Sequence, residues 1–195
     1  MIVISNPMEI VNETNIINAL FEEGMELFHI RKPNYSIEEL RSFLSAINSS
    51  YYSKLVLHQH HVLAEKFQIK RLHFTEKDRL AKPNRFLKPV RFLSTSVHSI
   101  TDFNGLPNIF DYSFLSPIYS SISKENYVPT KNAFEEIKKR TNQHTKLIAL
   151  GGVSVENIKN TLSNGFDNIA ILGTIWNSKN PIENFKKCQK IVHSF

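Results

Sequence analysis

Residues 146–174 read KLIALGGVSVENIKNTLSNGFDNIAILGT, and this stretch decides the fold. Two short apolar runs, 146–150 and 168–172, flank a helical pattern that starts with Ser154 as its cap and stops at Gly165. Neighbouring parallel strands need a crossover connection of this kind, whereas a tight hairpin joins antiparallel strands. The stretch therefore predicts one strand–helix–strand unit with parallel strands.

The same alternation runs through the rest of the chain. The predicted strands cover residues 2–5, 26–30, 55–57, 72–74, 91–95, 111–115, 146–150 and 168–172. Helical patterns lie between nearly all of these strands. Examples are 12–21, a helix that begins at the capping box of Ser36 and Glu39, and 130–139. Eight such repeats predict an α/β fold, a single small (β/α)8 TIM barrel forming one domain over 1–195. An open, doubly wound sheet is the alternative.

Composition narrows the possible partners. The net charge is +6, but the lysines are dispersed over predicted helix surfaces, so we expect a solvated surface and no nucleic-acid partner. No apolar run is long enough to span a bilayer, so we expect no membrane partner. Cys188 is the only cysteine and cannot form an internal disulfide. The opening residues show no leader pattern, and we expect a cytoplasmic protein.

Two glycine turns mark the functional end of the predicted barrel. Barrel enzymes work at the carboxyl ends of their strands, often with a phosphate between the last two loops. Gly151 and Gly152 follow the seventh strand, and Gly173 and Thr174 follow the eighth. Glycine lets backbone N–H groups approach a ligand closely, and a helix start near Ser154 adds its positive end. These residues predict a phosphate site, although the glycines could also serve only as tight turns.

Other groups suit a second anion. Arg31 directly follows the second strand, where a cation at the barrel mouth favours an anionic group; a surface ion pair is the alternative. The loop after the sixth strand carries Ser121, Ser123 and Lys124, which offer two hydroxyls and an ammonium for a phosphate or diphosphate.

The histidines offer two further possibilities. His29 and His58 fall near the ends of the second and third strands, and residues 57–61 read LHQHH. We expect His29, His58 and Gln59 to line the pocket. Imidazole is a common metal ligand, but no carboxylate or thiolate stands beside this run, which argues against a metal site there. His98, just past the fifth strand, is a candidate general acid and base. It could equally be a histidine at a helix start, bonded to backbone.

Five segments together resemble a known family. They are FHIR (28–31), STSVHS (94–99), SPIY (116–119), IALGGV (148–153) and ILGT (171–174). In this order they resemble the thiamine phosphate synthase and TenI family over almost the whole chain. The resemblance implies one of two activities. The synthase joins a pyrimidine methyl diphosphate to a thiazole phosphate and uses magnesium. The TenI-like tautomerase isomerises a thiazole carboxylate phosphate without a metal.

The resemblance also implies residue roles. Gly151, Gly152 and Gly173 would hold the thiazole phosphate. The residues that contact the diphosphate in the synthase are similar to Arg31, Ser121, Ser123 and Lys124 of this sequence. Asp78 stands where a magnesium carboxylate is expected.

The departures from the synthase pattern fall in the pyrimidine diphosphate half. The pattern has glutamine at His29, a lysine at Pro33, and Asn-Asp at His58-Gln59. The last change removes one of two carboxylates, and an amide is a poorer ligand for a hard cation. Residues 28–31 and 96–99 resemble the TenI branch, in which the histidine at position 98 moves the proton. Some synthases also have a histidine there, so His98 alone does not separate the two activities.

We therefore expect a TenI-like thiazole tautomerase that uses His98, needs no cofactor and binds a small phosphorylated thiazole. A divergent synthase that uses Asp78, Lys124 and magnesium is the second hypothesis. A catalytically silent binder of thiamine-pathway phosphates is the third. The sequence leaves homo-oligomer formation open.

Overall fold

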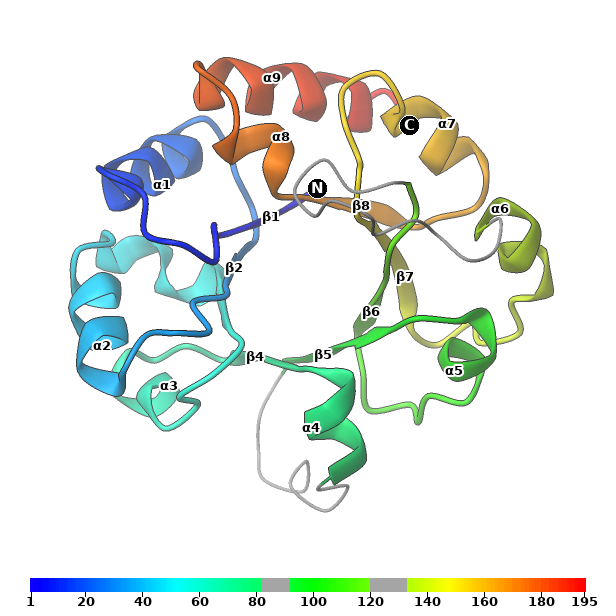
Figure 1. The fold of residues 1–195 in the computed structure, drawn as a ribbon, viewed down its shortest axis with the longest axis horizontal. Helices are drawn as coiled ribbons and strands as arrows, with labels where there is room; N and C mark the ends of the chain where they lie inside the picture. The colour runs from blue at the N-terminus through cyan, green and yellow to red at the C-terminus, as the bar shows by residue number, and fades with distance from the viewer. Residues whose placement is uncertain (82–91, 120–132) are drawn as a thin grey trace.

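The strand–helix repeat closes into a barrel in the computed structural model of the chain (Figure 1). The structure describes residues 1–81, 92–119 and 133–195. Each strand pairs in parallel with the next, and β8 pairs with β1. The strands are β1 (Ile2–Ile4), β2 (Phe28–Ile30), β3 (Leu55–Leu57), β4 (Arg71–Phe74), β5 (Phe92–Val97), β6 (Tyr112–Leu115), β7 (Lys146–Leu150) and β8 (Asn168–Ile171). The predicted barrel is confirmed, and the open sheet is wrong.

The helices surround the barrel, most of them as short segments (Figure 1). The α-helices are α1 (Glu13–Glu22), α2 (Ile37–Ser45), α3 (Leu63–Lys66), α4 (Glu76–Ala81), α5 (Ile100–Asn104), α6 (Ala133–Glu136), α7 (Ile158–Ser163), α8 (Gly173–Trp176) and α9 (Pro181–Val192). Among the described residues, Ser49–Lys54 form the 3-10 helix η1 and Ile137–Lys139 form the 3-10 helix η3. Strands of three to six residues and helices of one to three turns let a short chain complete the barrel. No helix in the described part of the chain has the length and apolar character to cross a membrane.

Side chains alternate between two cores because successive strand residues point to opposite faces. In β2, Phe28 and Ile30 join the large core between the sheet and the helices. His29 points the other way, into the barrel, where its ring contacts those of Tyr112 and Phe114. The apolar residues of the barrel interior are Ile2, Ile4, Tyr112, Phe114, Ile148 and Ala170. A polar side chain of a strand therefore reaches the barrel interior only at a position that faces inward.

The predicted caps are confirmed at one helix and wrong at another. Ser36 and Glu39 form the expected capping box at the start of α2. Ser154 does not cap α7, which begins only at Ile158. The Ser154 hydroxyl donates to Glu156, and its N–H donates to Asn157 Oδ1 at 2.9 Å, so these residues form a turn instead. Because α7 starts this far on, its N-terminus does not directly follow the glycine turn.

The helix predicted over 130–139 is broken into two pieces. Residues 133–136 form α6 and residues 137–139 continue as the 3-10 turn η3. Residues 130–132 lie outside the described part of the chain.

A buried ion pair fixes the segment that follows β2. The Lys32 side chain is 0% exposed and pairs with Glu13 at the start of α1. Lys32 Nζ also donates to the Met8 carbonyl at 2.8 Å and lies 5.2 Å from the centre of the Phe43 ring. Burial raises the pKa of Glu13, and the hydrogen bond and charge of Lys32 oppose that rise. The pair holds the backbone beside Arg31 against the first helix.

Candidate active site

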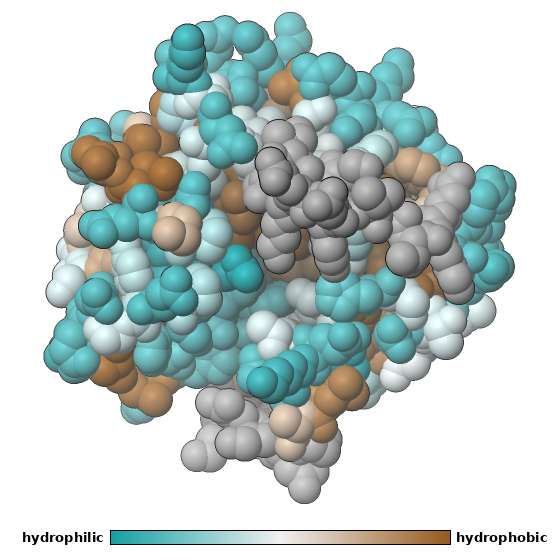
Figure 2. Space-filling view, viewed as in Figure 1, coloured by the Kyte–Doolittle hydropathy of each residue, from teal (hydrophilic) through white to brown (hydrophobic). Residues whose placement is uncertain are grey.

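The carboxyl ends of the strands surround a pocket of about 510 Å³. The space-filling view shows this face hollowed near its centre, with hydrophilic residues around the hollow (Figure 2). The polar and glycine residues that line the pocket are Arg31, His58, His73, Thr75, Glu76, Lys77, Ser96, His98, Ser116, Gly151, Gly152, Gly173 and Thr174. The pocket has the concave shape and mixed lining of a small-molecule site.

Both glycine turns line this one pocket. Gly151 and Gly152 have φ angles of 99° and 66°, a region that side chains rarely adopt. Gly173 begins α8, and the Thr174 hydroxyl donates to the Val153 carbonyl at 2.5 Å, which ties the two turns together. The predicted phosphate residues are therefore adjacent in space. Phosphate binding by them stays a prediction.

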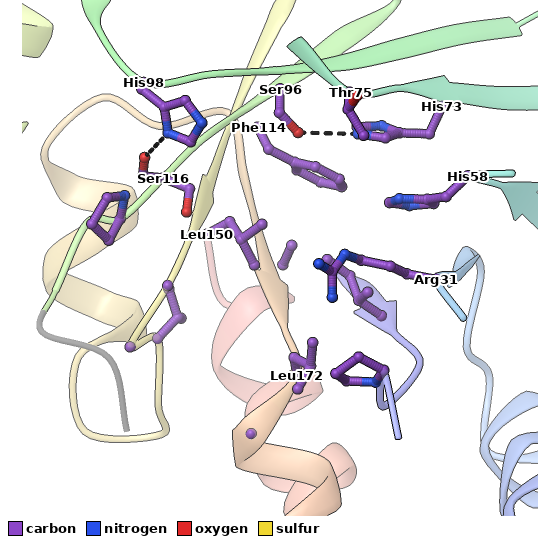
Figure 3. Close-up of a pocket in the computed structure, with 18 of the residues that line it drawn as sticks. Arg31, His58, His73, Thr75, Ser96, His98, Phe114, Ser116, Leu150 and Leu172 are labelled. Carbon is purple, nitrogen blue, oxygen red and sulfur yellow. Dashed lines mark hydrogen bonds between the residues drawn. The ribbon is translucent and has the colours of Figure 1, made fainter. Parts of the chain in front are cut away.

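Arg31 extends into the pocket from the end of β2 (Figure 3). Its backbone N–H donates to Ser5 Oγ at 2.7 Å, and Ser5 Oγ donates back to the Arg31 carbonyl at 3.1 Å. Burial lowers the pKa of the guanidinium from its ordinary value, but arginine remains charged in proteins. No ion pair among the described residues includes Arg31. Its positive charge is thus directed at the pocket rather than at a surface partner.

The rest of the predicted diphosphate set lies outside the described residues. Ser121, Ser123 and Lys124 belong to the segment 120–132. Their predicted role stays a prediction.

His98 lies at the pocket edge after β5, half exposed. Its Nδ1 is 2.7 Å from the carbonyl oxygen of Ser116 (Figure 3). A carbonyl can only accept, so Nδ1 carries a proton and the neutral ring keeps its lone pair on Nε2. That Nε2 is 4.0 Å from Glu76 Oε2. The backbone bond expected for a structural histidine is present, and the same bond leaves Nε2 available for proton transfer.

Three imidazoles meet inside the barrel beneath the pocket. His29 Nδ1 is 2.9 Å from His58 Nε2, and the rings of His58 and His73 stack with centroids 4.1 Å apart. Burial lowers the pKa of His73 to about 3 and holds the pKa values of His29 and His58 well below the usual range. All three rings are therefore neutral at physiological pH.

The other residues of the LHQHH run point elsewhere. His60 Nε2 donates to the Tyr35 carbonyl at 2.7 Å, and His61 Nε2 donates to the Leu57 carbonyl at 3.2 Å. The Gln59 amide donates to the Lys32 carbonyl, and Gln59 is not among the pocket-lining residues. Only His58 of this run reaches the pocket.

Asp78 lies away from the pocket lining and is exposed. Its carboxylate accepts from the Thr75 hydroxyl at 2.6 Å, and its N–H donates to Thr75 Oγ1 at 3.2 Å, which caps the first turn of α4. The carboxylate that does line the pocket is Glu76. A magnesium role for Asp78 stays a prediction that would require its side chain to leave this cap.

Sequence reasoning missed His73 and Glu76. A signal for His73 was present, because Leu72 and Phe74 flank it as Phe28 and Ile30 flank His29. In both strands a histidine stands alone between two apolar residues, so the three side chains alternate and the histidine must face the opposite side. Glu76 had no comparable signal, since its direction depends on where α4 begins.

Comparison with known proteins identifies the family of this chain. A model of the thiamine monophosphate synthase family matches residues 1–175. The chain belongs to this family. A thiamine-phosphate synthase of Staphylococcus saprophyticus is 25% identical over 190 residues, covering 91% of this chain and 89% of the relative. Another, from Leuconostoc citreum, is 22% identical and covers 82% of this chain.

Solved structures of the family superpose closely. A thiamine phosphate pyrophosphorylase from Bacteroides thetaiotaomicron has a TM-score of 0.80 and 29% identity, covering 99% of this chain and 97% of its own. One from Pyrococcus furiosus has a TM-score of 0.79 at 16% identity, which shows the fold alone. The resemblance stated from the sequence is confirmed. The names of the relatives favour the synthase over the tautomerase.

Proposed function

We propose that this protein is a thiamine phosphate synthase, which joins a pyrimidine methyl diphosphate to a thiazole phosphate. One observation carries the proposal: the Arg31 guanidinium and both glycine turns line the same pocket. Two separate anion-binding features suit a reaction between two phosphorylated substrates. The named relatives support the same activity.

The reaction breaks the bond between the pyrimidine methylene carbon and a diphosphate oxygen, and that carbon bonds to the thiazole nitrogen. Negative charge then accumulates on the departing diphosphate. Arg31, partly buried and directed into the pocket, would stabilise that charge, and a guanidinium can bind two phosphate oxygens at once. Backbone N–H groups around Gly152 and Gly173 would hold the thiazole phosphate so that its ring faces the reacting carbon.

The described residues do not reproduce the two-carboxylate magnesium set of the synthase pattern. Position 59 is an amide bonded to backbone, and Asp78 caps α4. Among the described residues that line the pocket, Glu76 supplies the single carboxylate. We therefore assign no step to magnesium.

A direct assay tests the proposal. Purified protein is incubated with the pyrimidine diphosphate, thiazole phosphate and magnesium, and thiamine phosphate is measured. We expect product, and we expect Arg31→Met to slow its formation while thiazole phosphate still binds by calorimetry. Tight binding of thiazole phosphate without any product would contradict the synthase.

The tautomerase is a second candidate, favoured by the geometry of His98. Its Nε2 is unprotonated in the neutral ring, accessible from the pocket and 4.0 Å from the Glu76 carboxylate, which would stabilise an imidazolium. A single base of this kind can remove a proton from one ring carbon and return it at another position.

The variant His98→Asn tests this second candidate. Loss of a general acid and base costs about 10²–10⁴-fold in rate, so thiazole isomerisation should fall by that factor while phosphate affinity stays nearly unchanged. If His98 only supports the structure, the variant instead loses thermal stability and isomerises at the parental rate per folded molecule. Both quantities are measured on one preparation.

A further inference from the structure

The strongest feature that the proposed function does not use is the group of three histidines inside the barrel. His29 is 0% exposed and His73 is 1% exposed, whereas His58, at 9%, reaches the pocket surface. One ring nitrogen of each lies within 4.8 Å of the corresponding nitrogens of the other two. Three imidazoles from β2, β4 and the end of β3 thus converge on one point.

Hydrogen-bond partners hold two of these rings in place. His29 Nε2 is 2.7 Å from the Tyr112 hydroxyl, which leaves Nδ1 facing His58. His73 Nδ1 is 2.9 Å from Ser94 Oγ, and its Nε2 is 3.0 Å from Ser96 Oγ. Metal-bound histidines usually donate their second N–H to an oxygen in this way, which fixes the ring orientation and the tautomer. His73 would exchange one of its two serine contacts for the ion and keep the other.

We propose that His29, His58 and His73 form a binding site for a divalent transition metal ion, with zinc the best match. Imidazole nitrogen suits zinc, cobalt, nickel and copper, whereas magnesium requires oxygen ligands. Around a tetrahedral zinc, bonds of about 2.0–2.1 Å place ligand nitrogens about 3.4 Å apart. The closest pair, His29 Nδ1 and His58 Nε2, shares a hydrogen bond at 2.9 Å, and the whole set lies within 4.8 Å. A bound ion would replace that hydrogen bond, its proton would move to the other nitrogen of the same ring, and small ring movements would complete the geometry.

The pocket gives an ion access to the site. His58 and His73 line the pocket, so an ion can enter from it and keep a coordination position directed at a bound molecule. Arg31 and Lys77 line the same pocket, and their positive charges oppose the binding of a cation. The Glu76 carboxylate, also on the pocket wall, partly offsets this repulsion, and an anionic ligand would offset it further.

Metal binding without substrates tests the site, so its failure would leave the proposed synthase untouched. Chelator-treated protein is titrated with zinc by calorimetry and with cobalt(II) by visible spectroscopy. We expect one zinc per chain with a dissociation constant below about 1 μM, which corresponds to about 8 kcal/mol. Cobalt should give the intense visible bands of a four-coordinate complex.

Variants locate the ion. His29→Gln and His73→Asn should each weaken zinc binding by more than about 100-fold, and Tyr112→Phe by about 10–100-fold. His58→Gln, at the pocket surface, repeats the test if the two interior variants fail to fold. The control is His60→Asn, because His60 belongs to the same run but bonds to the Tyr35 carbonyl, and asparagine tolerates its φ of 49°.

Three outcomes overturn the proposal. The first is wild-type protein that binds no stoichiometric zinc. The second is that His29→Gln and His73→Asn fold and bind zinc as tightly as the wild-type protein, which would assign the ion to surface histidines. The third is cobalt binding with only the weak spectrum of a six-coordinate aqua ion.

Discussion

The two sides of the pocket are built from different parts of the polypeptide. The glycine side consists of Gly151, Gly152 and Gly173, and it offers backbone groups from two consecutive loops. The imidazole side consists of His58 and His73, which line the pocket, with His29 buried behind them. These side chains come from β2, β4 and the residue that follows β3. The first depends on backbone conformation and the second on which way each strand residue points. We therefore expect substitutions to damage one side without the other.

The largest effect on stability should come from Lys32, which supports the backbone next to the imidazole side. Lys32→Ala leaves the Glu13 carboxylate buried without its partner, and breaking a buried pair in this way costs about 3–5 kcal/mol. Urea denaturation measures the loss. The double variant Glu13→Leu with Lys32→Met should recover most of it, because no charge remains buried.

Lys187→Ala is the control for this experiment. Lys187 pairs with Glu183 across one turn of α9, where both side chains are more than half exposed. Water screens such a pair, so the denaturation midpoint should barely move. If Lys32→Ala behaves in the same way, the buried pair does not stabilise the fold.

The next largest effect should be the loss of phosphate affinity when Gly152, on the glycine side, is replaced. Gly152→Asp brings a negative charge to the predicted phosphate position, and like charges in contact cost several kcal/mol, which is more than about 100-fold in affinity. Calorimetry with thiazole phosphate measures this loss. Gly152→Asn is the matched control, since asparagine tolerates the φ of 66° and adds no charge. Equal losses in both variants would mean that sterics, not charge, govern the site. Zinc affinity should stay unchanged in both.

The smallest effect should be that of a methyl group at Gly151. Its φ is 99°, and an added Cβ would lie 3.0 Å from Pro117 Cα. The backbone strain costs about 1–2 kcal/mol, so Gly151→Ala should lower the melting temperature. Gly105→Ala is the control, because Gly105 has a φ of −83° and its added Cβ would lie 3.7 Å from the nearest atoms. There the loss of unfolded-state freedom should stabilise the protein by about 0.4–1 kcal/mol.

The same comparison explains which parts of the site could be predicted. The glycine side was identified from residues 151–152 and 173–174 because each turn directly follows its own strand. The imidazole side was only half identified. Of the predicted pocket residues His29, His58 and Gln59, only His58 lines the pocket, and His73, which also lines it, was not predicted. The absence of a carboxylate or thiolate beside the LHQHH run argued against a metal site there. In the structure two members of that run bond to carbonyls, and the partners of His58 come from β2 and β4.

The direction of each side chain in α4 also determines which acidic residue lines the pocket. The family resemblance implied a magnesium carboxylate at Asp78, yet its side chain bonds to Thr75 at the start of α4, while Glu76, two residues earlier, lines the pocket. Successive side chains of a helix are rotated by about 100° around its axis, so Glu76 and Asp78 point in different directions. Where the helix begins therefore decides which of the two carboxylates faces the pocket.

The sequence by itself determined the barrel, the family and the glycine turns. These depend on the alternation of apolar and amphipathic segments and on contacts between residues close in the chain. Only the tertiary structure decided that three histidines separated by up to 44 positions share one point, and that Asp78 and Gln59 bond elsewhere. Closure of the barrel sets the register between strands, and register determines which inward-facing side chains meet.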